Sequence, residues 1–239
     1  RGDRFCMGRP NDALNAFDNW HYTDIPYNPD NLHITESRFP PRPSAVWALA
    51  EAISTFRYTK TSFACNMMLR FAIHIIGDMH QPLHCATLFS EGGRLGNFSG
   101  GDRGGNLFRI KPPSTPPGDE TGHWKSLHEL WDAGAGLYVY EWPLSGAEKA
   151  ELLRRAGEAK QEFPREHFPQ YNSSELKHCG TDPSYCIGVF ERWAREGHEL
   201  AISHAYAYGI HEGYDQAPSQ QYLDMVKVQS ERQVLLAGY

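Results

Sequence analysis

The sequence has no long uninterrupted apolar run, no cysteine pair of the CxxC type and no excess of positive charge. A membrane-spanning helix needs about 20 consecutive apolar residues, so none is predicted. The spacing of the five cysteines argues against a cysteine-ligated zinc site. A formal net charge of −6 argues against a broad basic surface for duplex nucleic acid, although bound metal ions can supply positive charge locally.

The composition is that of a globular protein with a substantial core. The 239 residues are 40% hydrophobic, and a single domain over residues 1–239 is the simplest interpretation. No signal peptide is visible, and the opening "RGDRFCMGRP" has no initiator methionine and resembles the middle of a chain. We therefore expect a longer protein that begins upstream of Arg1.

Cysteines and glycosylation sequons favour the secretory pathway. Cys179 and Cys186 are close enough in the sequence to form one disulfide, and the odd cysteine count leaves one cysteine without a partner. Sequons begin at Asn97 and Asn172. Together these features predict a glycoprotein of an oxidising compartment, which is secreted, on the cell surface or in a lysosome-like organelle.

Helical periodicity predicts a mainly α fold with long loops. Helices are expected over residues 44–58, 60–79, 122–133, 146–163, 183–209 and 218–236. The second of these carries an apolar stripe with a spacing of four residues: Phe63, Met67, Phe71 and Ile75. Ser145 and Glu148 form a capping box before the fourth helix. Residues 1–43 and 87–120 are expected to be mainly loop.

Two pairs of a histidine and an aspartate share one spacing. His74 and Asp78 lie four residues apart within "HIIGDMHQPLH", and His128 and Asp132 repeat this spacing later in the chain. Residues four apart project from one face of a helix, so each pair can bind one metal. A lone pair of this kind is usually an ordinary polar contact, but two pairs in apolar helices favour metal binding.

Two further histidines complete the set of candidate ligands. His84 follows the second helix, just after Pro82, and His21 lies in "WHYTD". Imidazole nitrogen and carboxylate oxygen are the usual zinc ligands where cysteine is absent. Four histidines and two aspartates exceed what one zinc needs, so the sequence predicts at least two metals.

The other candidate residues receive a structural interpretation. His80 lies two residues from Asp78 and therefore points elsewhere on the helix. Trp124 and Trp131 are expected in the core. No ligand spacing connects the cluster with the remaining histidines, which are His33, His123, His167, His178, His198, His204 and His211.

Four sequence blocks carry a family resemblance. In chain order they are "WHYTD" at 20–24, "FAIHIIGDMHQPLH" at 71–84, "GDRGGN" at 101–106 and "LHELWD" at 127–132. They resemble the zinc-dependent class I single-strand nucleases of the mung-bean-nuclease type, which include protist 3'-nucleotidase/nucleases. The resemblance implies a multi-helix fold of the three-zinc phospholipase C and nuclease architecture.

The resemblance also implies a ligand set. One zinc would be held by His21, His74 and Asp78. A second would be held by His84, His128 and Asp132. Asp78 would bridge to a third zinc, whose other ligands in the family are an N-terminal Trp and a nearby His; neither precedes His21 here. The third site is therefore expected to be incomplete in this chain, and a further Asp ligand of the first zinc is expected upstream.

The implied activity is hydrolysis of phosphodiester bonds in single-stranded DNA and RNA with 5'-phosphate products, together with 3'-nucleotidase activity. Asp78 would act at the metals that activate water, and Asn106 would donate to a phosphate oxygen. Tyr22 would stack on a splayed base and Asp24 would bind its edge. Arg1 is a candidate phosphate contact. A monomer without a protein partner is expected.

Two alternatives remain open at this point. A three-zinc phospholipase C would use a similar ligand set on phosphocholine lipids, and the "WHYTD" and "GGN" blocks favour the nuclease over it. A non-catalytic homologue would keep the fold and bind zinc or nucleotide. Hydrolysis of a phosphatidylcholine substrate without action on single-stranded DNA would favour the phospholipase over the nuclease.

Overall fold

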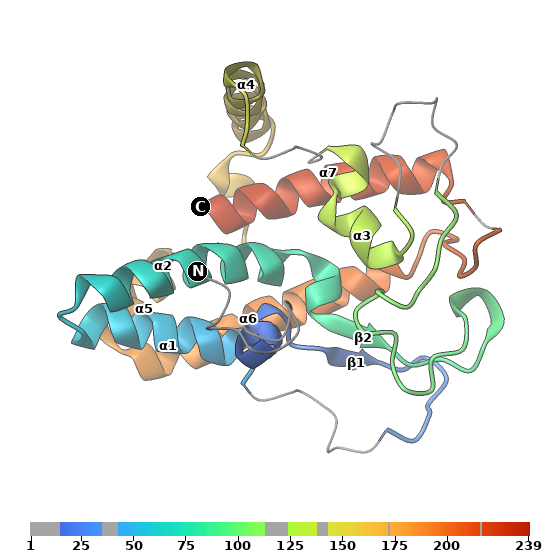
Figure 1. The fold of residues 1–239 in the computed structure, drawn as a ribbon, viewed down its shortest axis with the longest axis horizontal. Coiled ribbons are helices and arrows are strands. Elements are labelled where there is room, and N and C mark those ends of the chain that lie inside the picture. The colour runs from blue at the N-terminus through green and yellow to red at the C-terminus, as the bar shows by residue number, and fades with distance from the viewer. Residues whose placement is uncertain (1–14, 35–42, 113–123, 138–142, 172, 216) are drawn as a thin grey trace, which may run out of the picture.

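The computed structural model describes residues 15–34, 43–112, 124–137, 143–171, 173–215 and 217–239 (Figure 1). The fold is mainly helical, which confirms the predicted class. The described helices are α1 (Ala45–Tyr58), α2 (Ser62–His80), α3 (Leu127–Asp132), α4 (Gly146–Glu162), α5 (Ser173–Thr181), α6 (Pro183–Leu200) and α7 (Gln220–Gly238). Among them, none is both long enough and apolar enough to cross a membrane.

A short parallel pair of strands joins two distant parts of the chain. β1 (Ile25–Tyr27) pairs with β2 (Ala86–Leu88), with Ile25 opposite Ala86. The pairing extends towards the N-terminus, because the Thr23 N–H donates to the His84 carbonyl at 2.8 Å. The "WHYTD" block therefore lies beside the end of "QPLH".

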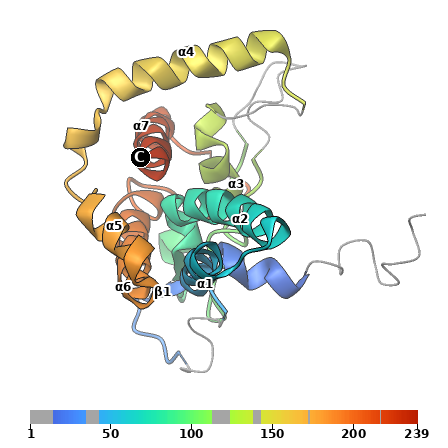
Figure 2. The same cartoon turned by 90° about the vertical axis from the view of Figure 1, so that its left-hand side faces the viewer.

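α2 lies between α1 and α7 in both views of the fold (Figures 1 and 2). Its buried face differs from the apolar stripe with a spacing of four residues, since the buried apolar residues are Met68, Ala72, Ile75 and Met79. Phe63 is 78% exposed, and Met67 and Phe71 are only half-buried. A helix turns once in 3.6 residues, so repeated steps of four drift around it by about 40° each, whereas alternating steps of four and three stay on one face.

Three expectations about helices need correction. α3 begins at Leu127, where the Ser126 hydroxyl accepts from the Glu129 N–H at 3.2 Å; residues 122 and 123 are outside the described part. α6 ends at Leu200 and continues only as a π-helical turn over Ala201–Ala205, because the positive φ of Tyr208 stops a helix to 209. α5 was not predicted; it is short and polar.

The capping box before α4 is confirmed. The Ser145 hydroxyl accepts from the Glu148 N–H at 3.2 Å, and the Glu148 carboxylate accepts from the Ser145 N–H at 2.7 Å. α4 runs along the outside of α7 in Figure 2. Ala159 is its buried residue.

The buried core has two main parts. One, around α1, α2 and α6, includes Cys179 and Cys186; the other, around β2, α3 and α7, includes Trp124 and Trp131 as predicted. Cys179 and Cys186 are hydrogen-bonded as free thiols, so the disulfide allowed by their spacing is not formed in this structure. Cys6 lies outside the described residues.

α6 packs closely on the segment after "QPLH", and this contact can be tested at a glycine. A Cβ at Gly197 would lie 2.6 Å from Cys85 Sγ, whereas a Cβ at Gly188, on the same helix, meets no atom within 4 Å. We expect Gly197→Ala to lower the free energy of unfolding by about 1–3 kcal/mol through overpacking. Gly188→Ala should raise it by about 0.5–1 kcal/mol through helix propensity. Urea denaturation measures both, and equal shifts of the same sign would contradict the packing.

Candidate metal centre

The first group of ligand atoms forms where the last turns of α2 meet residue 21. His74 and Asp78 project from the same face of α2, as their spacing predicted. His21, at the end of a 3-10 turn (Asn15–His21), places its Nδ1 2.9 Å from Asp78 Oδ2. His74 Nε2 lies 3.0 Å from His21 Nδ1 and 3.3 Å from Asp78 Oδ2. Three side chains from two segments thus converge on one point.

The second group forms between α3 and the 3-10 turn that follows α2. His84 closes the turn Pro82–His84, and its Nε2 lies 3.6 Å from Asp132 Oδ1. His128 Nε2 lies 3.5 Å from Asp132 Oδ2. Within each of the two groups, one ligand atom per residue lies within 4.8 Å of the others. The structure therefore brings the six predicted ligands together in the two predicted sets.

Backbone carbonyls orient the two imidazoles of the second group. His84 Nδ1 donates to the His21 carbonyl at 2.7 Å, and His128 Nδ1 donates to the Gly104 carbonyl at 2.7 Å. With the proton on Nδ1, each ring directs the lone pair of Nε2 towards Asp132. These are the tautomers that a metal ligand needs.

Gln81 is a site residue that the sequence analysis did not single out. Its Nε2 donates to Asp132 Oδ1 at 2.9 Å, and its Oε1 accepts from the Leu83 N–H at 2.6 Å. The amide therefore ties the carboxylate of α3 to the turn after α2. Gln81 lies between the ligands Asp78 and His84 in the sequence, and this position was the signal that could have identified it.

The electrostatics of the second group suit a cation. Burial lowers the pKa of His128 and favours its neutral form. Burial also acts on Asp132, but its hydrogen bond to His84 and the histidine charges outweigh it and lower the pKa of the Asp132 carboxyl. At His84 burial is likewise outweighed, chiefly by Asp132, and its pKa is raised. A metal ion that replaced the proton between His84 and Asp132 would leave both imidazoles neutral and the Asp132 carboxylate ionised. These are the protonation states that metal ligands need.

The donor set fits zinc. Each group offers two imidazole nitrogens and one carboxylate, which is a usual set for zinc without cysteine. Three protein ligands leave a coordination position open, as in catalytic rather than structural zinc sites.

Both groups face one cavity of about 720 Å³. Its walls include His21, His74, Asp78, His84 and Asp132, and they are completed by other residues that include Trp131 and part of the C-terminal half of α7. A polymer or nucleotide that enters this cavity can reach ligands of both groups at once.

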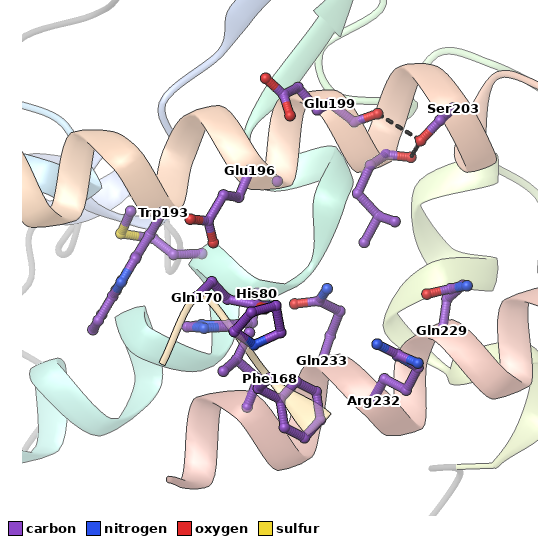
Figure 3. Close-up of a pocket in the computed structure, with 15 residues that line it drawn as sticks. His80, Phe168, Gln170, Trp193, Glu196, Glu199, Ser203, Gln229, Arg232 and Gln233 are labelled. Carbon is purple, nitrogen blue, oxygen red and sulfur yellow. Dashed lines mark hydrogen bonds between the residues drawn. The ribbon is translucent and has the colours of Figure 1, made fainter. Parts of the chain in front are cut away.

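A second cavity, of about 420 Å³, borders the last turn of α2 at Met79 and His80 (Figure 3). Trp193 and Glu196 of α6 and Arg232 of α7 line it, and neither ligand group contributes a residue. His80 borders both cavities and is buried, with its Nδ1 donating to the Ile76 carbonyl at 2.7 Å. This bond supports the structural interpretation of His80.

Tyr22 and Asp24 follow the ligand His21 in the chain, and neither is among the residues that line the cavity of about 720 Å³. The Tyr22 hydroxyl donates to Asn19 Oδ1 at 2.6 Å, and its ring is half-buried. Asp24 has a positive φ of 48°. Burial, aided by the charge of Asp102 and opposed by His84, raises the pKa of Asp24 to about 7. Asp24 therefore changes protonation within the neutral pH range.

Asn106 is exposed at the end of the "GDRGGN" loop. One of its amide N–H groups donates to the Arg103 carbonyl at 2.9 Å. The amide has a second N–H, which can donate to a phosphate oxygen while the hydrogen bond to the Arg103 carbonyl stays in place. Arg1, the other candidate phosphate contact, lies outside the described residues, and so does His123.

Comparison with known proteins identifies one family. The model of the family described as S1/P1 nuclease matches residues 9–239. A comparison with curated proteins found no match.

The two ligand groups predict the metal content of this chain. Zinc-loaded protein freed of excess metal should hold one zinc per group, and this can be counted by mass spectrometry under native conditions. His74→Ala should remove the zinc of the first group and His128→Ala that of the second. The exposed His211 belongs to neither group, so His211→Ala should change nothing. Loss of both metals in either single variant would contradict two separate groups.

Proposed function

The chain belongs to the S1/P1 nuclease family, a family of hydrolases that act on nucleic acid, and on this premise we propose a zinc-dependent nuclease specific for single strands. It would cleave phosphodiester bonds of single-stranded DNA and RNA, leave 5'-phosphate ends and remove 3'-phosphates from nucleotides. The observation that carries the proposal is the pair of His₂Asp groups that face one cavity. The family match favours this activity over a lipid phosphodiesterase.

Zinc bound at these groups supplies positive charge and Lewis-acid activation of water and of the phosphoryl group. The chain's own residues would position the zinc ions. His21, His74 and Asp78 would hold one ion and His84, His128 and Asp132 the other, with Asp78 available to bridge. Asn106 would donate its free N–H to a phosphoryl oxygen, whose charge grows during in-line attack of water on phosphorus.

Selection of single strands would follow from the residues around Tyr22. A base can lie against an aromatic ring only after it leaves the duplex stack. Tyr22 lies one residue from the ligand His21, so a base held there would place its phosphate near the metals. Asp24, two residues further, would bind the base edge.

The remaining proposals concern the whole protein. We propose one domain, supported by the match over residues 9–239, and a monomer. We propose a secreted, cell-surface or lysosome-like location, supported by the exposed Asn97 sequon. Asn172 lies outside the described residues, and the described cysteines carry free thiols, so they give no support. A third zinc would need ligands from residues upstream of those described.

The proposed function predicts a preference that one substitution should remove. Zinc-loaded protein should cleave a labelled single-stranded oligonucleotide and leave its duplex intact, with phosphatase-sensitive 5' ends. Tyr22→Ala should raise KM for the single strand roughly 5- to 150-fold, because base–aromatic stacking contributes about 1–3 kcal/mol.

Tyr22→Phe is the matched control, since it keeps the ring and removes only the hydroxyl that binds Asn19. Its KM should stay close to that of the unsubstituted protein. If the two variants behave alike, Tyr22 does not stack on a base. If the oligonucleotide is not cleaved with both metals bound, the nuclease proposal fails.

The pKa of about 7 at Asp24 predicts a base preference that depends on pH. Above pH 7 the carboxylate accepts two hydrogen bonds and suits the two donors of guanine; below pH 7 the protonated acid donates one and accepts one, as adenine requires. The ratio of kcat/KM for guanosine 3'-phosphate over adenosine 3'-phosphate should rise roughly tenfold as pH increases through 7. Asp24→Asn mimics the protonated acid and should keep the ratio low and flat. A ratio that rises equally in Asp24→Asn would exclude Asp24.

A further inference from the structure

A carboxylate without a positive partner is buried close to the second ligand group. Asp102 is 0% exposed and forms no ion pair among the described residues. It accepts instead from the Leu88 N–H at 2.9 Å, the Tyr206 hydroxyl at 2.8 Å and the Thr87 hydroxyl at 3.4 Å. Burial raises the pKa of Asp102 to about 6 even with these donors. Burial of a carboxylate without a positive partner costs free energy, so we expect Asp102 to have a specific role.

The loop that starts at Asp102 is pressed against the turn that carries His84. Three consecutive residues, Arg103, Gly104 and Gly105, have positive φ values of 57°, 60° and 79°. A Cβ at Gly104 would lie 2.4 Å from the Leu83 carbonyl oxygen, so this approach requires glycine. The Gly104 N–H donates to the Thr87 hydroxyl at 3.1 Å.

The same loop holds His128 at two points. The Gly104 carbonyl accepts from His128 Nδ1 at 2.7 Å, and the Gly105 carbonyl accepts from the His128 backbone N–H at 3.3 Å. The Gly104 N–H is linked to the Asp102 carboxylate through the Thr87 hydroxyl, which accepts from this N–H and donates to Asp102 Oδ1. A continuous set of hydrogen bonds therefore leads from the carboxylate to the imidazole.

We infer that Asp102 and Tyr206 form a positioning pair for His128, and that they act through the backbone of Gly104 and Gly105. The pair sets the position of the loop, and the loop sets the tautomer and direction of the imidazole. This inference rests on the proposed metal function of His128. Neither Asp102 nor Tyr206 would touch the metal or the substrate.

The carboxylate at position 102 accepts a hydrogen bond at each of its two oxygens. One oxygen receives the Leu88 N–H of β2 and the other the Tyr206 hydroxyl, which follows the π-helical turn after α6. Asparagine at this position would keep an acceptor for the Leu88 N–H and direct an N–H group towards the Tyr206 oxygen. The hydroxyl can accept from that N–H, but its own O–H then loses the acceptor that the carboxylate provides. Asp102→Asn therefore disturbs the loop without changing the volume of the side chain. Tyr206→Phe is milder, because it removes one donor and keeps the ring.

Ser90→Ala is the matched control for loss of a buried hydrogen bond. Ser90 is also 0% exposed and follows β2, but its hydroxyl donates to the Gly96 carbonyl at 2.8 Å and does not contact the loop from 102 to 106. A merely structural role for Asp102 predicts that all three variants lower the melting temperature and leave zinc binding unchanged.

Zinc titration in two backgrounds separates the ligand groups. With His74→Ala, only the second group binds, and there Asp102→Asn and Tyr206→Phe should weaken zinc binding by about 10- to 100-fold. With His128→Ala, only the first group binds, and the same substitutions should have no effect. Ser90→Ala should be neutral in both. Equal weakening at both groups, or at neither, would overturn the inference; if Asp102→Asn does not fold, Tyr206→Phe decides.

The histidine tautomer gives a readout without metal. Nitrogen NMR of the metal-free protein should place the His128 proton on Nδ1, and Asp102→Asn should produce a mixture of tautomers. If the unsubstituted chain binds no zinc, the proposed function fails while this measurement still tests the positioning. An unchanged tautomer in Asp102→Asn, with zinc bound normally, would refute the positioning alone.

Discussion

The site depends on the hydrogen bonding between two backbone segments, residues 21–27 and 84–89. The Thr23 N–H donates to the His84 carbonyl, and His84 Nδ1 donates in return to the His21 carbonyl. Further along, β1 and β2 continue the contact up to Phe89, whose N–H donates to the Tyr27 carbonyl. This pairing brings His21 to the end of α2 and directs His84 towards α3. One backbone contact thus contributes a ligand to each group.

Acidic groups near the site oppose local stability in the absence of a cation. Asp24 is half-buried and Asp102 is buried, and the pKa of each carboxyl rises mainly through burial. Residues that break local rules together in one place are typical of functional sites. In a chain of net charge −6, bound dications would offset this local excess.

The loop over residues 101–106 connects the chemistry of the site to the core. Its glycines allow the backbone to approach the His84 turn, and its carbonyls orient His128. Asp102 anchors it to β2 and to Tyr206, whose ring packs in the core around α3 and α7. Backbone hydrogen bonds of this loop therefore connect the core to the ligand His128. Backbone groups fix the orientation of the imidazole ring more firmly than a mobile side chain would.

The sequence by itself determined the mainly α class, the capping box of α4, the family and the two His-Asp pairs. These depend on spacings within one helix, where four residues make about one turn whatever surrounds them. The family resemblance assigned His21 to the first pair and His84 to the second, but no spacing within a helix does so. The tertiary structure supplies the physical reason, because backbone pairing joins two segments that lie far apart in the chain. The tertiary structure also decided which face of α2 is buried, and that Asp102 is linked to His128 through the backbone of the loop. A period in the sequence defines the faces of a helix, but only its neighbours determine which face is covered.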